Sequence, residues 1–223
     1  MSRLLFMAGL LGVASCGPQA PSPVTPLTGV RLTNYANGKP WARIELERGM
    51  GNGTWETWFE DGTPKSIDHM QTGILHGASE AWFEGGKPRF RGAYEQGQPT
   101  GHWTRWYPNG NMLSDGSYVR GVQVDEWTNW YPDGTVQIEA DYTGMGGSGD
   151  FAYFYEDGKP KSAGEIRDGV RTGLWREWWP NEVLRKQMTF LEGKLEGPAE
   201  FYHKTGKPDA ARTGTYADGK LQK

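Results

Sequence analysis

Residues 101–121 read GHWTRWYPNGNMLSDGSYVRG, and variants of this stretch recur along the chain with a period of 24 residues. The period repeats eight times from Gly29 almost to the end of the sequence. Such self-similarity indicates a repeat architecture, in which each unit contacts mainly its neighbours. Glycines mark position 1 of the unit at Gly29, Gly53, Gly77, Gly101, Gly149, Gly173 and Gly197, with Asp125 in the gap. They mark position 10 at Gly38, Gly62, Gly86, Gly110, Gly134, Gly158 and Gly206, with Glu182 as the exception.

Each unit has the chemistry of one β-hairpin. The Trp-rich first half favours a strand, because aromatic residues fit a pleated, half-buried surface. Pro108-Asn109-Gly110 is typical of a type I turn followed by a glycine in the left-handed conformation. A second strand ends near Tyr118, and a glycine-bounded turn leads to the next unit. The sequence therefore predicts an all-β fold, an extended antiparallel β-hairpin array of eight 24-residue units with about sixteen short strands. Glycine at this frequency excludes stable helices.

Aromatic columns supply the core. Leu, Ile, Val and Phe are scarce, but Phe, Trp and Tyr make up 13% of the chain, with 11 Trp. Side chains alternate between the faces of a strand, so positions 3 and 7 should share one face and position 6 the other, unless a bulge intervenes. One ladder forms the core, and the other is either covered by sheet curvature or exposed as a groove. Position 3 holds Trp55, Trp103, Trp127, Phe151 and Trp175, interrupted by Ser79. Position 6 holds the candidate ligand-binding residues Trp58, Trp82, Trp106, Trp130 and Trp178, whose alternative role is structural packing.

The ends of the array differ from its middle. The first unit has Arg31 and Asn34 where rings are expected, and the last has Ala199 and His203. Terminal repeats usually become polar caps, so we expect both ends to be capped. In the fifth unit residues 144–149, GMGGSG, indicate a bent turn, with a flexible hinge as the alternative.

A leader precedes the array. Residues 1–16 have a short basic start and about a dozen apolar residues, which is typical of a secretory signal. Val-Ala-Ser-Cys at 13–16 resembles a bacterial lipobox, in which Cys16 would be acylated; an ordinary signal with a chance cysteine is the alternative. Residues 17–28 carry four prolines and predict an extended tether. The array occupies 29–220, followed by a tail at 221–223.

The resemblance to a lipoprotein precursor implies a lipid anchor. Cys16 would carry a diacylglyceryl group and usually a third chain, and several chains anchor a protein stably in a membrane. In a Gram-negative host, Gly17 in place of Asp implies sorting to the outer membrane, facing the periplasm. We therefore expect an exported, lipid-anchored protein.

Catalytic and metal-binding motifs are missing from the sequence. The histidines His69, His76, His102 and His203 lie in no metal-spaced cluster. The glycines are spaced for hairpins, so they form no phosphate loop, and there is no nucleophile elbow. The formal net charge of −3 gives no electrostatic footprint for nucleic acid. We expect no enzyme activity, no cofactor and no metal.

Three stretches carry a family resemblance. Residues 103–110, 127–134 and 175–181 resemble the bacterial variant of the MORN repeat, with the pattern Trp-x-x-Trp-Tyr-Pro-Asn-Gly followed by Tyr-x-x-Gly. The likeness extends over residues 29–220. It implies a curved antiparallel β array used for protein or lipid contacts, and many bacterial members are catalogued as antitoxins.

Three functions fit these features. The first is a membrane-tethered module that binds a protein partner in the cell envelope, including an immunity protein against a periplasmic toxin. The second is glycan binding, for instance to peptidoglycan, through exposed Trp and Tyr ladders. The third is a structural spacer without a ligand.

Overall fold

The computed structural model describes residues 27–143 and 147–222. The predicted signal segment, Cys16 and most of the proline-rich tether lie outside the described residues, as does part of the 144–149 turn. The strands are β1 Gly29–Asn34, β2 Pro40–Glu47, β3 Met50–Trp58, β4 Pro64–Gln71, β5 Ile74–Trp82, β6 Pro88–Glu95, β7 Gln98–Trp106, β8 Met112–Val119, β9 Val122–Trp130, β10 Val136–Tyr142, β11 Gly149–Phe154, β12 Pro160–Arg167, β13 Val170–Trp178, β14 Leu184–Leu191, β15 Lys194–Phe201, β16 Gly214–Ala217 and β17 Lys220–Leu221.

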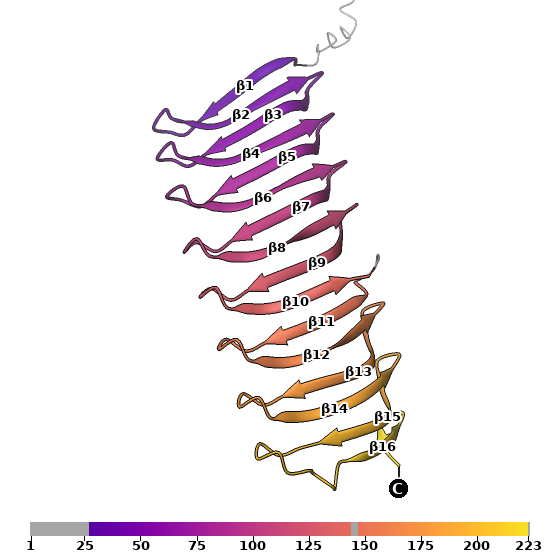
Figure 1. The fold of residues 1–223 in the computed structure, drawn as a ribbon. Helices are drawn as coiled ribbons and strands as arrows, with labels where there is room; N and C mark the ends of the chain where they lie inside the picture. Colours follow the sequence, from indigo (N-terminus) through magenta and orange to yellow (C-terminus); the bar gives the residue numbers. More distant parts are fainter. Residues whose placement is uncertain (1–26, 144–146, 223) are drawn as a thin grey trace, which may run out of the picture.

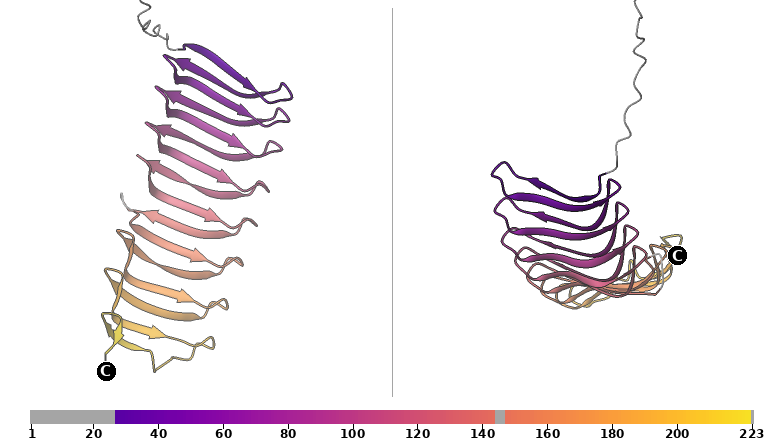
Figure 2. Two further views of the ribbon diagram at one scale, coloured as in Figure 1. Left: turned by 180° about the vertical axis from the view of Figure 1, so that it is seen from behind. Right: turned by 90° about the horizontal axis from the view of Figure 1, so that it is seen from above.

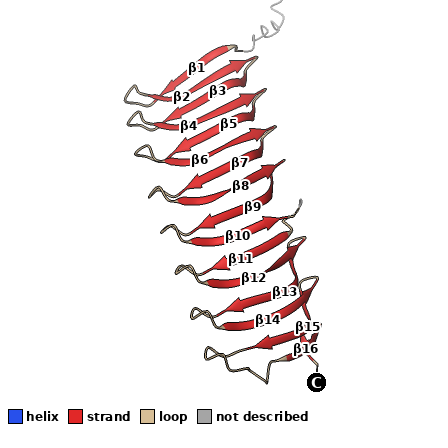
Figure 3. Ribbon diagram, viewed as in Figure 1, coloured by secondary structure: helices blue, strands red, loops and turns tan. Residues whose placement is uncertain are grey.

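Each strand pairs antiparallel with the next in the sequence, from β1–β2 to β16–β17, so the chain forms one open meander (Figure 1). Figure 3 shows strands and loops only, and the described part of the chain has no helix long and apolar enough to cross a membrane. The predicted all-β hairpin array is confirmed. It has 17 strands in place of about sixteen, because the last residues add the short β17.

Two alternating turns join the strands. Within a unit, the turn begins at Tyr107, whose carbonyl oxygen accepts the N–H of Gly110 at 2.9 Å. Gly110 has φ 99°, the left-handed conformation that the Pro-Asn-Gly sequence predicts. Between units, Arg120 (φ 50°) and Gly121 (φ 78°) form a two-residue turn with both φ values positive, as in type I′ hairpins. We call the first kind the hairpin tips; they lie on the left in Figure 1.

Bulges near the tip bend the first seven repeats. Arg105 pairs with Ser114 but Trp106 pairs with Met112, so one extra residue, Leu113, stands in the second strand near the tip. Such bulges kink a strand and increase its twist. The strands are curved, and the sheet seen end-on has the cross-section of a trough (Figure 2).

The core lies within this single layer. Trp103 and Trp127 are 2% exposed and Trp175 is 1% exposed. Only on the concave face of a curved sheet do side chains converge enough to shield one another so completely, so the position 3 ladder occupies that face. Tyr118 stands between two of the indoles, with its ring centroid 6.1 Å from that of Trp103 and 4.9 Å from that of Trp127, both edge-on.

Glycines beneath the indoles make this packing possible. A Cβ on Gly92, Gly116 or Gly164 would lie 2.2–2.5 Å from an indole carbon of Trp103, Trp127 or Trp175, respectively. All three glycines occupy position 16 of their unit, and the indole of the next unit lies across each of them. The indole N–H of Trp127 reaches past Gly116 to donate to the carbonyl oxygen of Ser117 at 2.9 Å.

Where position 3 is not a tryptophan, the residue at position 16 of the preceding unit is no longer glycine. Ala140 stands opposite the smaller ring Phe151, and Met188 stands opposite Ala199. Ser79, which interrupts the aromatic column, instead donates a hydrogen bond to Asp68. Positions 16 and 3 of successive units therefore vary together from the Asp68–Ser79 pair onward, whereas Ile44 stands opposite Trp55, whose indole is only half-buried.

The two ends of the sheet differ from the predicted pair of polar caps. At the C-terminal end, the short β16 and β17 and the Tyr202–Pro208 bridge cover part of β15. At the other end, β1 keeps apolar side chains in solvent, with Val30 59% and Leu32 57% exposed. Arg31 and Asn34 replace rings on this strand, but they do not make the edge polar as a whole.

Candidate binding surface

The predicted position 6 indoles lie in a row at the hairpin ends of their strands. Each pairs with position 12 across the hairpin, as Trp58 does with Pro64 and Trp130 with Val136. The extra residue of the tip bulge belongs to the partner strand. The Trp-bearing strand therefore alternates regularly and directs position 6 to the convex face, opposite the buried ladder. We call the residues Trp58, Trp82, Trp106, Trp130 and Trp178 the tip row; all five are half-buried.

Hydrogen bonds between units hold the tips in register. The hydroxyl of Tyr107 donates to the carbonyl oxygen of Trp130, and that of Tyr155 to the carbonyl oxygen of Trp178, each at 2.9 Å. Tyr35, Tyr131 and the indole N–H of Trp179 make the equivalent bond. Position 7 thus bonds the backbone of Trp58, Trp130 and Trp178 in the tip row, whereas Phe59 and Phe83 offer no such bond to Trp82 and Trp106. The regular recurrence of Tyr at this position was the available sequence signal, but a strand pattern alone does not show contact with the following unit.

Basic side chains lie beside the tip row and were not predicted. The ammonium of Lys65 lies 5.6 Å from the ring centroid of Phe59, and the Arg185 guanidinium lies 4.5 Å from that of Trp179. Both cations occupy position 13, the bulged residue of the second strand, as do Arg89 and Lys161. Cation–π contact stabilises such arrangements. The bulge places these chains next to the rings, which a regular strand would not.

A hollow opens where position 7 is Phe. It has a volume of ≈ 400 Å³ and contains one predicted site residue, Trp82. Its remaining lining is Phe59, Lys65, Phe83, Glu84, Arg89 and Pro108. This part of the tips combines apolar rings with two cations.

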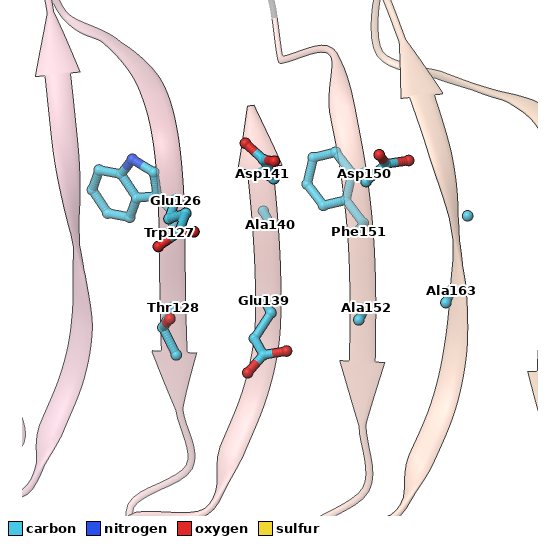
Figure 4. A pocket seen from close by; sticks show the side chains of 11 residues that line it. Glu126, Trp127, Thr128, Glu139, Ala140, Asp141, Asp150, Phe151, Ala152 and Ala163 are labelled. Atoms are coloured by element: carbon cyan, nitrogen blue, oxygen red, sulfur yellow. The ribbon is translucent and has the colours of Figure 1, made fainter. Parts of the chain in front are cut away.

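A second hollow lies farther along the array, across β9, β10, β11 and β12, with a volume of ≈ 570 Å³ (Figure 4). Glu126, Glu139, Asp141 and Asp150 surround it, and Ala152 leaves space between them. Glu126 flanks Trp127 in sequence, so strand alternation directs these carboxylates to the convex face, whereas the lining also includes Trp127 and Phe151 from the concave-face column. In residues 27–143 and 147–222 there is no cluster of three or more His, Cys, Asp or Glu suited to a metal ion.

Hydrogen bonds and burial set the ionisation of a few side chains. The pKa of Glu45 lies below its usual value because its carboxylate accepts the backbone N–H of Thr54 and a guanidinium N–H of Arg43. Burial raises the pKa of Tyr94 and Tyr142 on the concave side, so both phenols stay protonated at neutral pH. These groups serve packing and hydrogen bonding.

Comparison with protein families supports the repeat assignment. A family model described as MORN repeat variant matches residues 99–120 and 171–192. The two spans correspond to the hairpins β7–β8 and β13–β14. A comparison with curated proteins gave no match. The chain is thus a β-hairpin repeat protein with two stretches that match the MORN repeat variant.

Proposed function

We propose that this chain is a non-catalytic repeat protein that binds a protein partner in the cell envelope, anchored to a membrane through acylated Cys16. The observation that supports the partner-binding role is the tip row with its basic neighbours. Trp, Tyr and Arg are the residues that most often dominate the energetics of protein interfaces. Sixteen inter-strand steps of about 4.8 Å give a surface on the order of 75 Å long.

The chemistry of the tips favours an acidic partner surface. Lys65 and Arg89 border the same hollow as Trp82, with Glu84 as the one carboxylate in its lining. A partner that brings a carboxylate and an apolar side chain would satisfy both the cations and the rings. Charge complementarity of this kind raises association rates and selects partners.

Crosslinking in intact cells tests this role. The wild-type chain should capture a specific partner, and the double variant Lys65→Glu/Arg89→Glu should lose it. Arg48→Glu/Arg120→Glu is the matched control, because it also reverses two exposed charges, both in between-unit turns at the other end of the strands. Repeated failure to capture a partner with the wild type, or equal capture by the double variant, would contradict the proposal.

The anchor needs a separate experiment. Cys16→Ala should remove incorporation of labelled fatty acid and move the protein from the membrane fraction to the soluble fraction. Unchanged membrane association would show that Cys16 is not the anchor, whatever the partner. If the partner proves to be a periplasmic toxin, the chain is an immunity protein, and its deletion would then harm cells that express the toxin.

Glycan binding is the second candidate, favoured by the half-burial of the tip row. A half-buried indole offers part of its ring face to a sugar while its strand keeps it fixed. Titration with peptidoglycan fragments should then change the tryptophan fluorescence of the wild type and change it less in Trp82→Ala. A flat titration would eliminate this function and leave the protein partner or the spacer.

A further inference from the structure

In the part of the chain that the structure describes, strand β1 pairs with one neighbour. It pairs with β2 over its full length from Gly29 to Asn34. The equivalent strand of every later unit, from β3 to β15, pairs on both sides. Within the described residues, the outer edge of β1 therefore presents backbone N–H and C=O groups that no other strand uses.

The opposite end of the array shows how such an edge can be protected. Beyond β15, the backbone N–H of Asp209 bonds the carbonyl oxygen of Phe201 at 2.8 Å. The N–H of Phe201 bonds the Thr213 hydroxyl at 3.1 Å. The strands that come after β15 are only four and two residues long. Short strands and covering loops are the usual protection of a sheet edge, and among residues 27–143 and 147–222 neither is found at β1.

The side chains of β1 also differ from those of the equivalent strands. Leu32 occupies position 4, on the convex face, and is 57% exposed; Val30 at position 2 is 59% exposed. Leu27, just before the strand, is 58% exposed. Apart from Ala152, position 4 of the other units is polar: Glu56, Glu80, Thr104, Thr128, Arg176 and Glu200. At position 4, β1 thus carries a leucine where most other units have a polar residue, whereas position 2 is also apolar at Ala78, Leu174 and Pro198.

The geometry points to a second copy of this chain as the occupant of the edge, with the two β1 strands paired antiparallel about a twofold axis. A register that places Leu32 opposite its counterpart also places Arg31 opposite Thr33, so no like charges meet. The register shifted to bring Arg31 opposite Arg31 would be unfavourable. Because both strands have the same twist and bend, the two arrays join into one continuous antiparallel sheet, and Val30 and Leu32 of both copies meet on its convex face.

The partner is identified by self-complementarity. Strand β1 is apolar on one face, carries a single charge and can continue the antiparallel order of its own sheet. In a twofold dimer each β1 therefore offers its copy the same edge and the same side chains that it receives. Closed twofold symmetry is the commonest form of association between identical chains. This dimer does not depend on the tip row, so it can be tested independently of the proposed function.

Crosslinking of the full-length chain in mild detergent tests the contact. Leu32→Cys treated with a short bismaleimide should give mostly covalent dimer. Leu174→Cys is the matched control, since Leu174 is an exposed convex-face leucine, 43% accessible, in the interior strand β13. The wild type gives the background from Cys16. Dimer from Leu32→Cys at the level of Leu174→Cys would overturn the inference.

Sedimentation gives an independent measurement. The wild type should sediment at twice the mass of one chain, and Leu32→Lys should sediment as the single chain, because two lysines would face each other at the twofold axis. Leu174→Lys should keep the dimer. A monomeric wild type, or a dimer that survives Leu32→Lys, would overturn the inference even if a partner protein is found at the tips.

Discussion

Replacing Gly116 by Ala tests how this single-layer sheet buries its core. The new Cβ would lie 2.2 Å from Cδ2 of Trp127 and 2.3 Å from Cε2. Since carbon atoms in contact are about 3.5 Å apart or more, the indole must retreat by about 1.3 Å. Overpacking of this kind costs about 1–3 kcal/mol, and loss of the indole hydrogen bond to Ser117 adds about 1 kcal/mol.

The expected net destabilisation of Gly116→Ala is about 2–4 kcal/mol. For a chain of this size it corresponds to a fall in Tm of about 4–16 °C, measured by circular dichroism. The sign of the change in stability tests the role of the indole, because Gly→Ala at an unstrained strand position would by itself stabilise the protein by about 0.4–1 kcal/mol by lowering the entropy of the unfolded chain. A Tm that is unchanged or raised would refute the idea that Trp127 needs the absence of a Cβ.

The chain provides its own control for this prediction. In the next unit Ala140 pairs directly with Phe151 in a ladder without a register shift, which shows an alanine beside a phenylalanine ring at these repeat positions, although the β8–β9 ladder shifts register at Gly116. In a Trp127→Phe background, Gly116→Ala should therefore cost less than about 1 kcal/mol, which gives a coupling energy above about 1 kcal/mol in the double-mutant cycle. An equal cost in both backgrounds would show that the penalty comes from the backbone and not from the ring.

Three further predictions concern single residues, and the Tm of each variant tests them. Tyr131→Phe removes a hydroxyl bond to the next unit and should destabilise by about 1 kcal/mol, whereas Phe83→Tyr should stabilise by a similar amount by adding the missing bond. Glu182 holds φ 64° where most units have glycine, so Glu182→Gly should stabilise by about 1 kcal/mol. Folding lowers the pKa of Glu45, so its carboxylate contributes fully to the free energy of unfolding above the ordinary pKa of 4.5. This contribution is lost as the pH falls through the folded pKa. Glu45→Gln should therefore make Tm less dependent on pH on the acid side.

The sequence predicted the parts of the fold that recur within one unit. The period, the Pro-Asn-Gly turns and the aromatic strand each depend on residues a few positions apart, and all are found. The contacts between units were not predicted. Gly116 was visible at a fixed position, but its role requires knowing that Trp127 crosses it in the following unit. Lys65 reaches Phe59 only because a bulge changes the register, and a bulge leaves no clear sequence pattern. For the same reason the bare edge at Leu32 became visible only once the strand pairing was known.

The concave face buries the position 3 rings, so the proposed binding role falls to the convex face and the tips. Under that proposal, a change in the tip row would alter binding without removing the core, since Trp82 and Trp103 lie on opposite faces of the sheet. A dimer paired through β1 would also leave the convex face and the tips of both copies free. It would double the recognition surface to about 150 Å while adding one strand pair. With the twofold axis at Leu32, the two Leu27 residues, just outside the paired strands, would lie ten residues apart along the strand direction, about 33 Å. Two tethers would then start from the middle of the dimer, and two anchors bound to one membrane hold far more strongly than one.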